Sequence, residues 1–290
     1  MTDPQQSIHD LIAGFITARE IKLPVFNPVA LRLQQALTRN DIKITDIELM
    51  IVEDQALTSQ ILRVANAAFY KGLQPITTIH KAIIRLGTQQ VANLAMVAAQ
   101  QQMYQKSSGA FQSYQEKLWR HAFASAMGSK WLAERCGFRT AAENAFLAGL
   151  LHNMGQLALL KIIADLYATG FVPANLPSTL ITEILDSAMH TEQGYLLAKK
   201  WNLPDEYCVV VQNHHQEPCD PNNALLLFVR LVDQACEKVG IGLHGDPQIA
   251  LAATPEAQAL PPEALMPLMS RLRSRSSAFG EGGKETFNTV

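Results

Sequence analysis

Apolar positions recur with the spacing of an α-helix along nearly the whole chain, and no stretch alternates between apolar and polar residues as a half-buried strand does. The pattern therefore predicts an all-α fold, a multi-helix bundle in two lobes. The expected helices cover about 6–20, 28–38, 45–53, 55–69, 78–86, 88–105 and 111–136, then a helix from 140 through His152 and Asn153, then 157–167, 178–187, 190–201, 205–215, 222–239 and 262–275, with a short helix near Gln248.

Start and stop residues support several of these boundaries. Asn27–Pro28 has the pattern of an N-cap followed by the first helical residue, and Asp54 is placed to cap the next long helix. Gly87 fits the position just after a helix end. The spacings in Thr45–Glu48 and Thr140–Glu143 predict two capping boxes.

One internal boundary stands out, at Ser107–Ser108–Gly109. It divides the chain into an N-terminal helical lobe, residues 1–106, and a second helical lobe, residues 107–242. Residues 243–290 form a C-terminal extension with some helix. Its last part is polar and rich in glycine, which predicts a disordered tail.

Composition excludes several classes of protein. The 290 residues are 48% apolar and 17% charged, as in a globular protein with an ample core. A net charge of −2 argues against a broad nucleic-acid surface, and the short basic run 271–275 does not change this. We see no signal peptide and no apolar run of membrane-spanning length. Four scattered cysteines predict free thiols, and together these features predict a cytoplasmic protein without a membrane partner.

Candidate chemistry lies in the second half. The apolar run 146–160 contains one strongly polar pair, His152 and Asn153, and Asp233 stands inside another apolar helix. An isolated buried carboxylate is costly, so Asp233 requires a partner. A single histidine on an apolar face is usually a hydrogen-bonded core residue. The set is larger, however, and its members share ligand chemistry: His121, His152, Asn153, His190, His214, His215 and Asp233.

The order His … His-Asp … Asp is the signature of the HD metal-dependent phosphohydrolases, and this chain resembles it at His121, His152–Asn153 and Asp233. Longer motifs narrow the resemblance: DQALTSQILRVANAAFY, ITTIHKAIIRLGTQQV, LWRHAFASA, AFLAGLLHNMGQLAL and HTEQGYLLAKKWNLP, in that order. Together they resemble the HDOD domain, a degenerate helical relative of the HD and HD-GYP phosphodiesterases that occurs in bacterial signalling proteins.

This resemblance implies metal ligands at His121, His152, Asn153 and Asp233, with His190, His214 and His215 at the positions of additional ligands in HD-GYP enzymes. The chain departs from those enzymes at three places. Asn153 replaces the aspartate, Lys117 stands where an acidic ligand is found, and residues 216–218 lack the Gly-Tyr-Pro signature.

The amide of Asn153 is a weaker ligand than a carboxylate and cannot offset the charge of a cation. One divalent metal (iron, manganese, nickel or zinc), weakly held, is compatible with the remaining donors, whereas a two-metal clamp on a phosphodiester is not supported. Lys117 would repel a metal or would itself occupy the vacant charge position.

Three functions remain open. The first is an HDOD-type regulatory binding module in signal transduction, non-catalytic, whose partner is a signalling protein or an anionic small molecule such as a nucleotide. The second is a metal-dependent phosphohydrolase acting on nucleotides or cyclic dinucleotides. The third is a scaffold in which the site persists only through hydrogen bonds.

In the first lobe, Asp54 and Asn66 are expected to have structural roles, as a cap and as a hydrogen-bonding residue between helices. Arg63 and Arg85 are candidates for contact with an anionic ligand, with a solvated position as the alternative.

Overall fold

The computed structural model describes residues 12, 14, 26–38, 42–66, 74–105, 109–172 and 176–280, without the side chains of Pro262 and of residues 275–280. Most of the expected first helix, the Ser107–Ser108 break and residues 281–290 of the expected disordered tail lie outside these residues. Residues 276–280, also expected in the tail, are helical instead. Within them the regular structure is helical and includes no strand, so the predicted all-α fold is confirmed.

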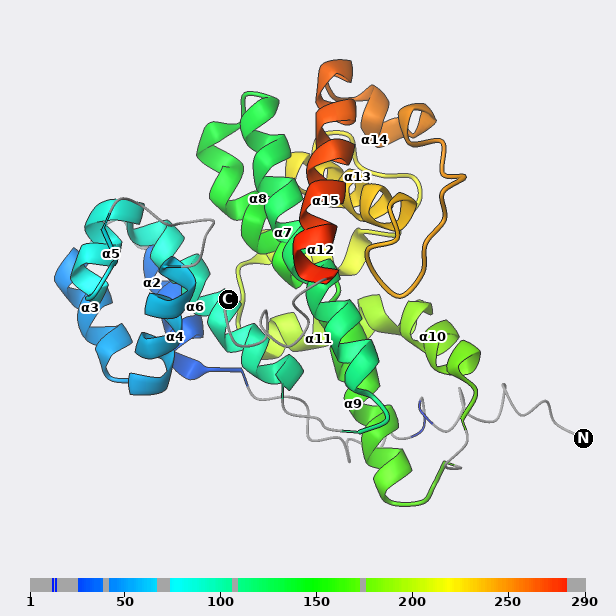
Figure 1. The fold of residues 1–290 in the computed structure, drawn as a ribbon, viewed down its shortest axis with the longest axis horizontal. Coiled ribbons are helices and arrows are strands. Elements are labelled where there is room, and N and C mark those ends of the chain that lie inside the picture. Colours follow the sequence, from blue (N-terminus) through cyan, green and yellow to red (C-terminus); the bar gives the residue numbers. More distant parts are fainter. Residues whose placement is uncertain are drawn as a thin grey trace, which may run out of the picture.

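The first helices gather at one side of the molecule (Figure 1). They are α2 (Pro28–Leu37), α3 (Ile44–Val52), α4 (Gln55–Ala65), α5 (Ile79–Leu86) and α6 (Thr88–Gln105). Helix α6 packs on α2 and α4 and also on α7 and α8, so it joins this group to the rest of the chain.

The remaining helices surround α7 and α8, which form the most extensive helix pair. They are α7 (Gln112–Arg135), η1 (Arg139–Ala141), α8 (Ala142–Leu151), α9 (Met154–Ala168), α10 (Ser178–Asp186), α11 (Met189–Lys200), α12 (Asp205–Asn213), α13 (Ala224–Lys238), η2 (Leu251–Ala253), α14 (Pro255–Gln258), η3 (Pro262–Ala264) and α15 (Leu265–Gly280).

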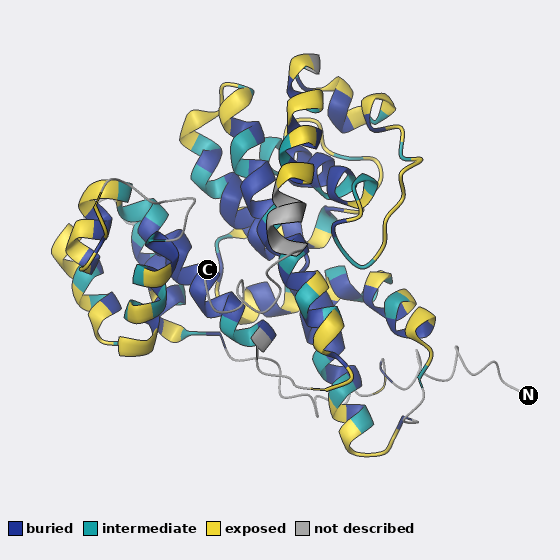
Figure 2. Cartoon of the chain, viewed as in Figure 1, coloured by how far each residue is buried: buried dark blue, intermediate teal, exposed yellow. Residues whose placement is uncertain are grey.

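Within the described part of the chain two apolar clusters make up the core, seen as the dark inner faces of the helices in Figure 2. The larger extends from Ile12 and Phe26, before α2, to Val229 on α13, across both expected lobes. In the smaller cluster, Leu268 and Leu272 of α15 pack against α7 and α13. The C-terminal helices are therefore attached through their own apolar contacts. The division into lobes at residue 106 stays a prediction.

Local capping signals were predicted with mixed success. Asn27 accepts hydrogen bonds from the N–H groups of Val29 and Ala30, and Asp54 accepts one from Leu57, as expected. Both predicted capping boxes are wrong. Helix α3 begins one residue before Thr45, and Asp46 reaches back to the N–H of its N-cap instead. Glu143 is paired with Lys130 of α7, because a tertiary cation competes for its carboxylate.

Three helix boundaries also differ from expectation. The helix expected to carry His152 and Asn153 stops at Leu151, and the two residues form a break before α9. Helix α12 ends at Asn213, so the His214–His215 pair follows it. The short helix expected near Gln248 is displaced to residues 251–258.

Asn66 has a structural role, but its partner lies in the segment before α5 and not, as had been expected, in a helix. Its amide accepts a hydrogen bond from the N–H of Ile76 at 2.8 Å and donates one to the carbonyl of Ile76 at 2.7 Å. These two bonds fix the chain that leads into α5.

Among the described residues one stretch, Arg139–Ala168, is long and apolar enough to cross a membrane, and its most apolar window has a mean hydropathy of 1.4. In the fold, 94% of its most apolar window is buried, and the break at His152–Asn153 interrupts it. Buried core helices commonly have this composition, so the stretch is weak support for a membrane span.

Candidate metal centre

Two glycines explain why the polar break between α8 and α9 lies so close to other helices. A Cβ atom at Gly149 would lie 2.5 Å from the carbonyl oxygen of Ser125 on α7. A Cβ atom at Gly155 would lie 1.8 Å from the carbonyl oxygen of His190 on α11. Only glycine permits such contact between backbones. The break is therefore held between α7 and α11, beside their histidines.

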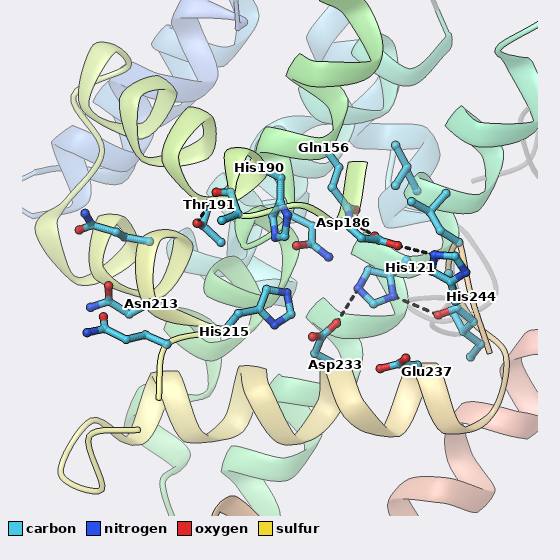
Figure 3. A pocket seen from close by; sticks show the side chains of 18 residues that line it. His121, Gln156, Asp186, His190, Thr191, Asn213, His215, Asp233, Glu237 and His244 are labelled. Atoms are coloured by element: carbon cyan, nitrogen blue, oxygen red, sulfur yellow. Dashed lines mark hydrogen bonds and ion pairs between the residues drawn. The ribbon is translucent and has the colours of Figure 1, made fainter. Parts of the chain in front are cut away.

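The first group of candidate ligands, here called the His–Asp cluster, consists of His121 on α7, His152 in the break and Asp233 on α13. The Nε2 atoms of the two histidines are 3.2 Å apart. Oδ1 of Asp233 lies 3.0 Å from Nε2 of His121 and 3.5 Å from Nε2 of His152. Figure 3 shows His121 above Asp233 at one side of a cavity. The expectation that Asp233 has a partner is thus confirmed.

The outer nitrogen of each histidine in the cluster is fixed by the backbone. Nδ1 of His121 lies 3.1 Å from the carbonyl oxygen of Ile241, and Nδ1 of His152 lies 2.8 Å from that of Gly149. A carbonyl only accepts, so each Nδ1 carries a proton; in the neutral imidazole Nε2 then presents a lone pair, and in the charged imidazole Nε2 donates to the carboxylate. Two lone pairs and a carboxylate oxygen converge, an arrangement that requires a proton or a metal cation between them. The donor set suits zinc, iron, manganese or nickel.

The charges within the His–Asp cluster support one another. Burial favours a neutral Asp233, but its hydrogen bonds to His121 and His152 hold its pKa well below the usual range. Burial also favours a neutral His121, which by itself would lower its pKa. The hydrogen bond to Asp233 and the charge of Asp233 outweigh this effect, so the pKa of His121 is raised. The charged forms of His121 and Asp233 therefore stabilise each other.

The second group, here called the histidine trio, consists of His190 on α11 with His214 and His215 after α12. The Nε2 atoms of His190 and His214 are 3.2 Å apart. Their Nδ1 atoms donate to the carbonyls of Ser187, at 2.7 Å, and Val211, at 2.9 Å. Burial, followed by the charge of His215, lowers the pKa of His190 to about 4 and that of His214 well below its usual range. Burial also lowers the pKa of His215, so the trio is a set of neutral ligand donors.

Asn153 faces the histidine trio. Its Oδ1 lies 3.0 Å from Nε2 of His214, and the residue is 8% exposed. The sequence grouped Asn153 with His121, His152 and Asp233, whereas its polar contact in the structure is with His214. The ring centres of His152 and His214 are 5.1 Å apart, so the two groups are neighbours and Asn153 lies at their junction.

A cavity of about 610 Å³ opens onto both groups (Figure 3). Its polar lining consists of histidines, amides, Thr191 and three carboxylates, and among the described residues it includes no lysine or arginine. The cations that the sequence proposed for ligand binding lie elsewhere. Lys117 is exposed on α7 and does not line the cavity, and Arg63 and Arg85 are exposed on α4 and α5. Arg85 donates to the carbonyl of Gln74 at 2.6 Å.

Sequence reasoning missed a third polar group in the cavity. Asp186, at the end of α10, accepts a hydrogen bond from Nε2 of Gln156 at 2.9 Å and forms an ion pair with His244 (Figure 3). Burial, more than its neighbours, raises the pKa of Asp186. No motif marks these residues, since each is an ordinary polar residue near the end of an element.

Comparison with known proteins places the chain in a family. The family model of the HDOD domain matches residues 23–217. A protein of Treponema pallidum is 25% identical over 213 residues, which are 72% of this chain and 41% of that one. The chain thus spans less than half the length of that relative.

Solved structures share the fold. An HDOD domain protein of unknown function from Geobacter sulfurreducens superposes with a TM-score of 0.71 at 22% identity, over 92% of this chain and 94% of that chain. A protein of Shewanella amazonensis, provisionally named a metal-dependent phosphohydrolase, gives 0.65 at 20% identity, over 91% and 98%. One from Marinobacter aquaeolei, provisionally named a signal transduction protein, gives 0.67 at 23% identity, over 88% and 58%. The family match covers well over half of the sequence, and the chain belongs to the HDOD domain family.

Proposed function

We propose that this protein is an HDOD regulatory module of signal transduction whose His–Asp cluster binds one divalent metal ion and whose cavity does not catalyse hydrolysis. The observation that carries the proposal is the convergence of two Nε2 lone pairs and a carboxylate oxygen at 3.0–3.5 Å, with both outer nitrogens tied to the backbone. The signalling role is supported by family membership and by the name given to the Marinobacter aquaeolei structure.

The cavity lining suggests how a ligand would be recognised. Asp186, Asp233 and Glu237 line it, and no lysine or arginine is among its described lining residues. Without a bound cation, these carboxylates would repel an anionic small molecule such as a nucleotide. A bound divalent ion would supply the positive charge that such a ligand needs. Amides of Gln212 and Asn213 and the hydroxyl of Thr191 are available to position it.

Asn153 supports the non-catalytic assignment. The His–Asp cluster contributes one carboxylate, and the histidine trio with Asn153 contributes neutral donors only. Two-metal cleavage of a phosphodiester relies on two closely spaced metal ions and an activated water. A second divalent ion held by the trio and Asn153 would have no carboxylate among these ligands to offset its repulsion from the first.

Manganese binding to metal-free protein, measured by equilibrium dialysis and elemental analysis, tests the proposal. We expect about one equivalent per chain in the wild type and at least tenfold weaker binding in Asp233→Asn. Glu237→Gln is a matched control, because Glu237 lies one turn further along α13 and lines the same cavity outside the cluster. A wild type that binds no manganese, or an Asp233→Asn variant that binds it equally well, would refute the proposal.

The hydrolase remains a second candidate, favoured by the position of the histidine trio next to the His–Asp cluster. It predicts cleavage of a phosphodiester or a cyclic dinucleotide by the metal-loaded wild type. His152→Ala should abolish that cleavage while the fold persists. A wild type that cleaves nothing with manganese, iron, nickel or zinc excludes this candidate.

A further inference from the structure

The side chain of Arg230 connects the histidine trio to the C-terminal segment that follows the matched HDOD region. Arg230 lies on α13 and is 3% exposed. Its Nη1 donates to two carbonyl oxygens in the turn that carries the trio, that of His214 at 3.2 Å and that of Gln216 at 2.8 Å. The position of this turn therefore depends on the orientation of one buried guanidinium.

Two carboxylates hold that guanidinium. Nε of Arg230 donates to Oε1 of Glu256 at 2.5 Å, and Nη2 contacts Glu217. Glu256 lies on α14 and is fully buried, whereas the side chain of Glu217 is 68% exposed. An exposed ion pair contributes little, because water screens it. A buried pair that loses one partner leaves an uncompensated charge in the core. Glu256 is therefore the residue that fixes Arg230.

The same segment contacts the His–Asp cluster. The carbonyl of Ile241 accepts the Nδ1 proton of His121, and His244 pairs with Asp186 in the cavity. A Cβ atom on Gly242 would lie 3.2 Å from Nδ1 of His121. Residues 241–244 thus form one wall of the cavity, and they lie, like Glu256, beyond residue 217, where the family match ends.

We infer that Glu256 is a positioning residue for the candidate metal centre: through Arg230 it sets the backbone of the His214–His215 turn and so ties the C-terminal segment to the histidine trio. The inference rests on the proposed function in one respect: the proposed function is what makes the His214–His215 turn part of a ligand-binding site. A molecule that displaced α14 would act on the trio by this route.

The imidazole N–H protons of metal-free protein provide the test. His214 and His152 each donate Nδ1–H to a backbone carbonyl in a buried place, so both protons should exchange slowly with water. The exchange rates are compared by NMR after ¹⁵N-histidine labelling, with assignments from histidine substitutions. We expect Glu256→Gln to speed exchange at His214 at least tenfold and to leave His152 within twofold.

Glu217→Gln is the matched control, since it removes the exposed partner of the same arginine. It should leave both rates within twofold. If Glu256→Gln fails to fold, the protection of His152 against exchange is lost as well. The double variant Arg230→Met/Glu256→Leu then decides, because it replaces the buried pair by apolar groups of similar size, an exchange that buried ion pairs often tolerate.

That double variant also deletes the hydrogen bonds to the carbonyls of His214 and Gln216, and we expect the same tenfold effect at His214. An exchange rate at His214 within twofold of the wild type, in a folded Glu256→Gln or in the folded double variant, would overturn the inference. Because the measurement uses no metal, a wild type that binds no manganese would refute the proposed function and leave this result to stand by itself.

Discussion

Substituting Asn153 by aspartate tests whether a single amide determines the metal affinity of the cavity. The two side chains have nearly the same shape, so the change adds charge with little steric effect. The new carboxylate oxygen would lie about where Oδ1 of Asn153 lies, 3.0 Å from Nε2 of His214 and at the junction of the two candidate ligand groups. Asn153 is 8% exposed, so water would screen the added charge only in part.

The magnitude follows from Coulomb's law. Two unit charges at 4 Å attract by about 4 kcal/mol at an effective dielectric constant of 20, and a divalent ion doubles this. Burying the carboxylate costs several kcal/mol, which offsets much of the gain. A net gain of about 1.5–3 kcal/mol remains, and at about 1.4 kcal/mol for each factor of ten we expect binding tighter by about 10- to 100-fold.

Cobalt binding to metal-free protein, measured by calorimetric titration, is a suitable assay. Asn213→Asp is the matched control, because it makes the same exchange at another residue that lines the cavity, which Figure 3 shows on the side away from His121 and Asp233. We expect it to change affinity less than threefold. Equal affinities for the wild type and Asn153→Asp would refute the reasoning, and so would an equal gain in both variants.

Two further predictions concern stability. In the folded protein His190 stays neutral down to its pKa of about 4. In the unfolded chain the same side chain takes up a proton near pH 6.5. The metal-free protein should therefore lose up to about 3 kcal/mol of stability from this residue as the pH falls from 6.5 to 4. Chemical denaturation at several pH values measures this loss, and His190→Gln should flatten it; an unchanged slope would contradict the assignment. Gly155→Ala places a methyl group 1.8 Å from a backbone oxygen, so we expect a loss of about 3 kcal/mol or more together with weaker manganese binding. Asn66→Ala is the control for Gly155→Ala. It should cost about 2 kcal/mol of stability by leaving the N–H of the buried Ile76 unpaired, and it should leave manganese binding intact. Equal effects of both variants on manganese binding would count against a local role of Gly155.

The sequence by itself determined the fold class and several local features. The helical period depends on neighbours three and four residues away, so it survives without any knowledge of the fold. The caps at Asn27 and Asp54 are equally local, since each side chain bonds to an N–H two or three residues ahead. The burial cost of a charge inside an apolar helix was enough to show that Asp233 needs a partner.

Only the tertiary structure decided how the candidate ligands are grouped. His121, His152 and Asp233 come from three helical regions far apart in sequence, and no local rule reports the angle at which those regions cross. Glu143 is a second example, because its carboxylate pairs with Lys130 on another helix instead of forming the predicted cap. The direction of Asn153 toward His214, the exposure of Lys117 and the pairing of Asp186 with His244 all depend on these crossings. Helix packing depends on many weak contacts between residues distant in sequence, so the sequence alone does not predict which helices cross or at what angle. A cap is a bond between near neighbours, so its residues can be identified directly in the sequence.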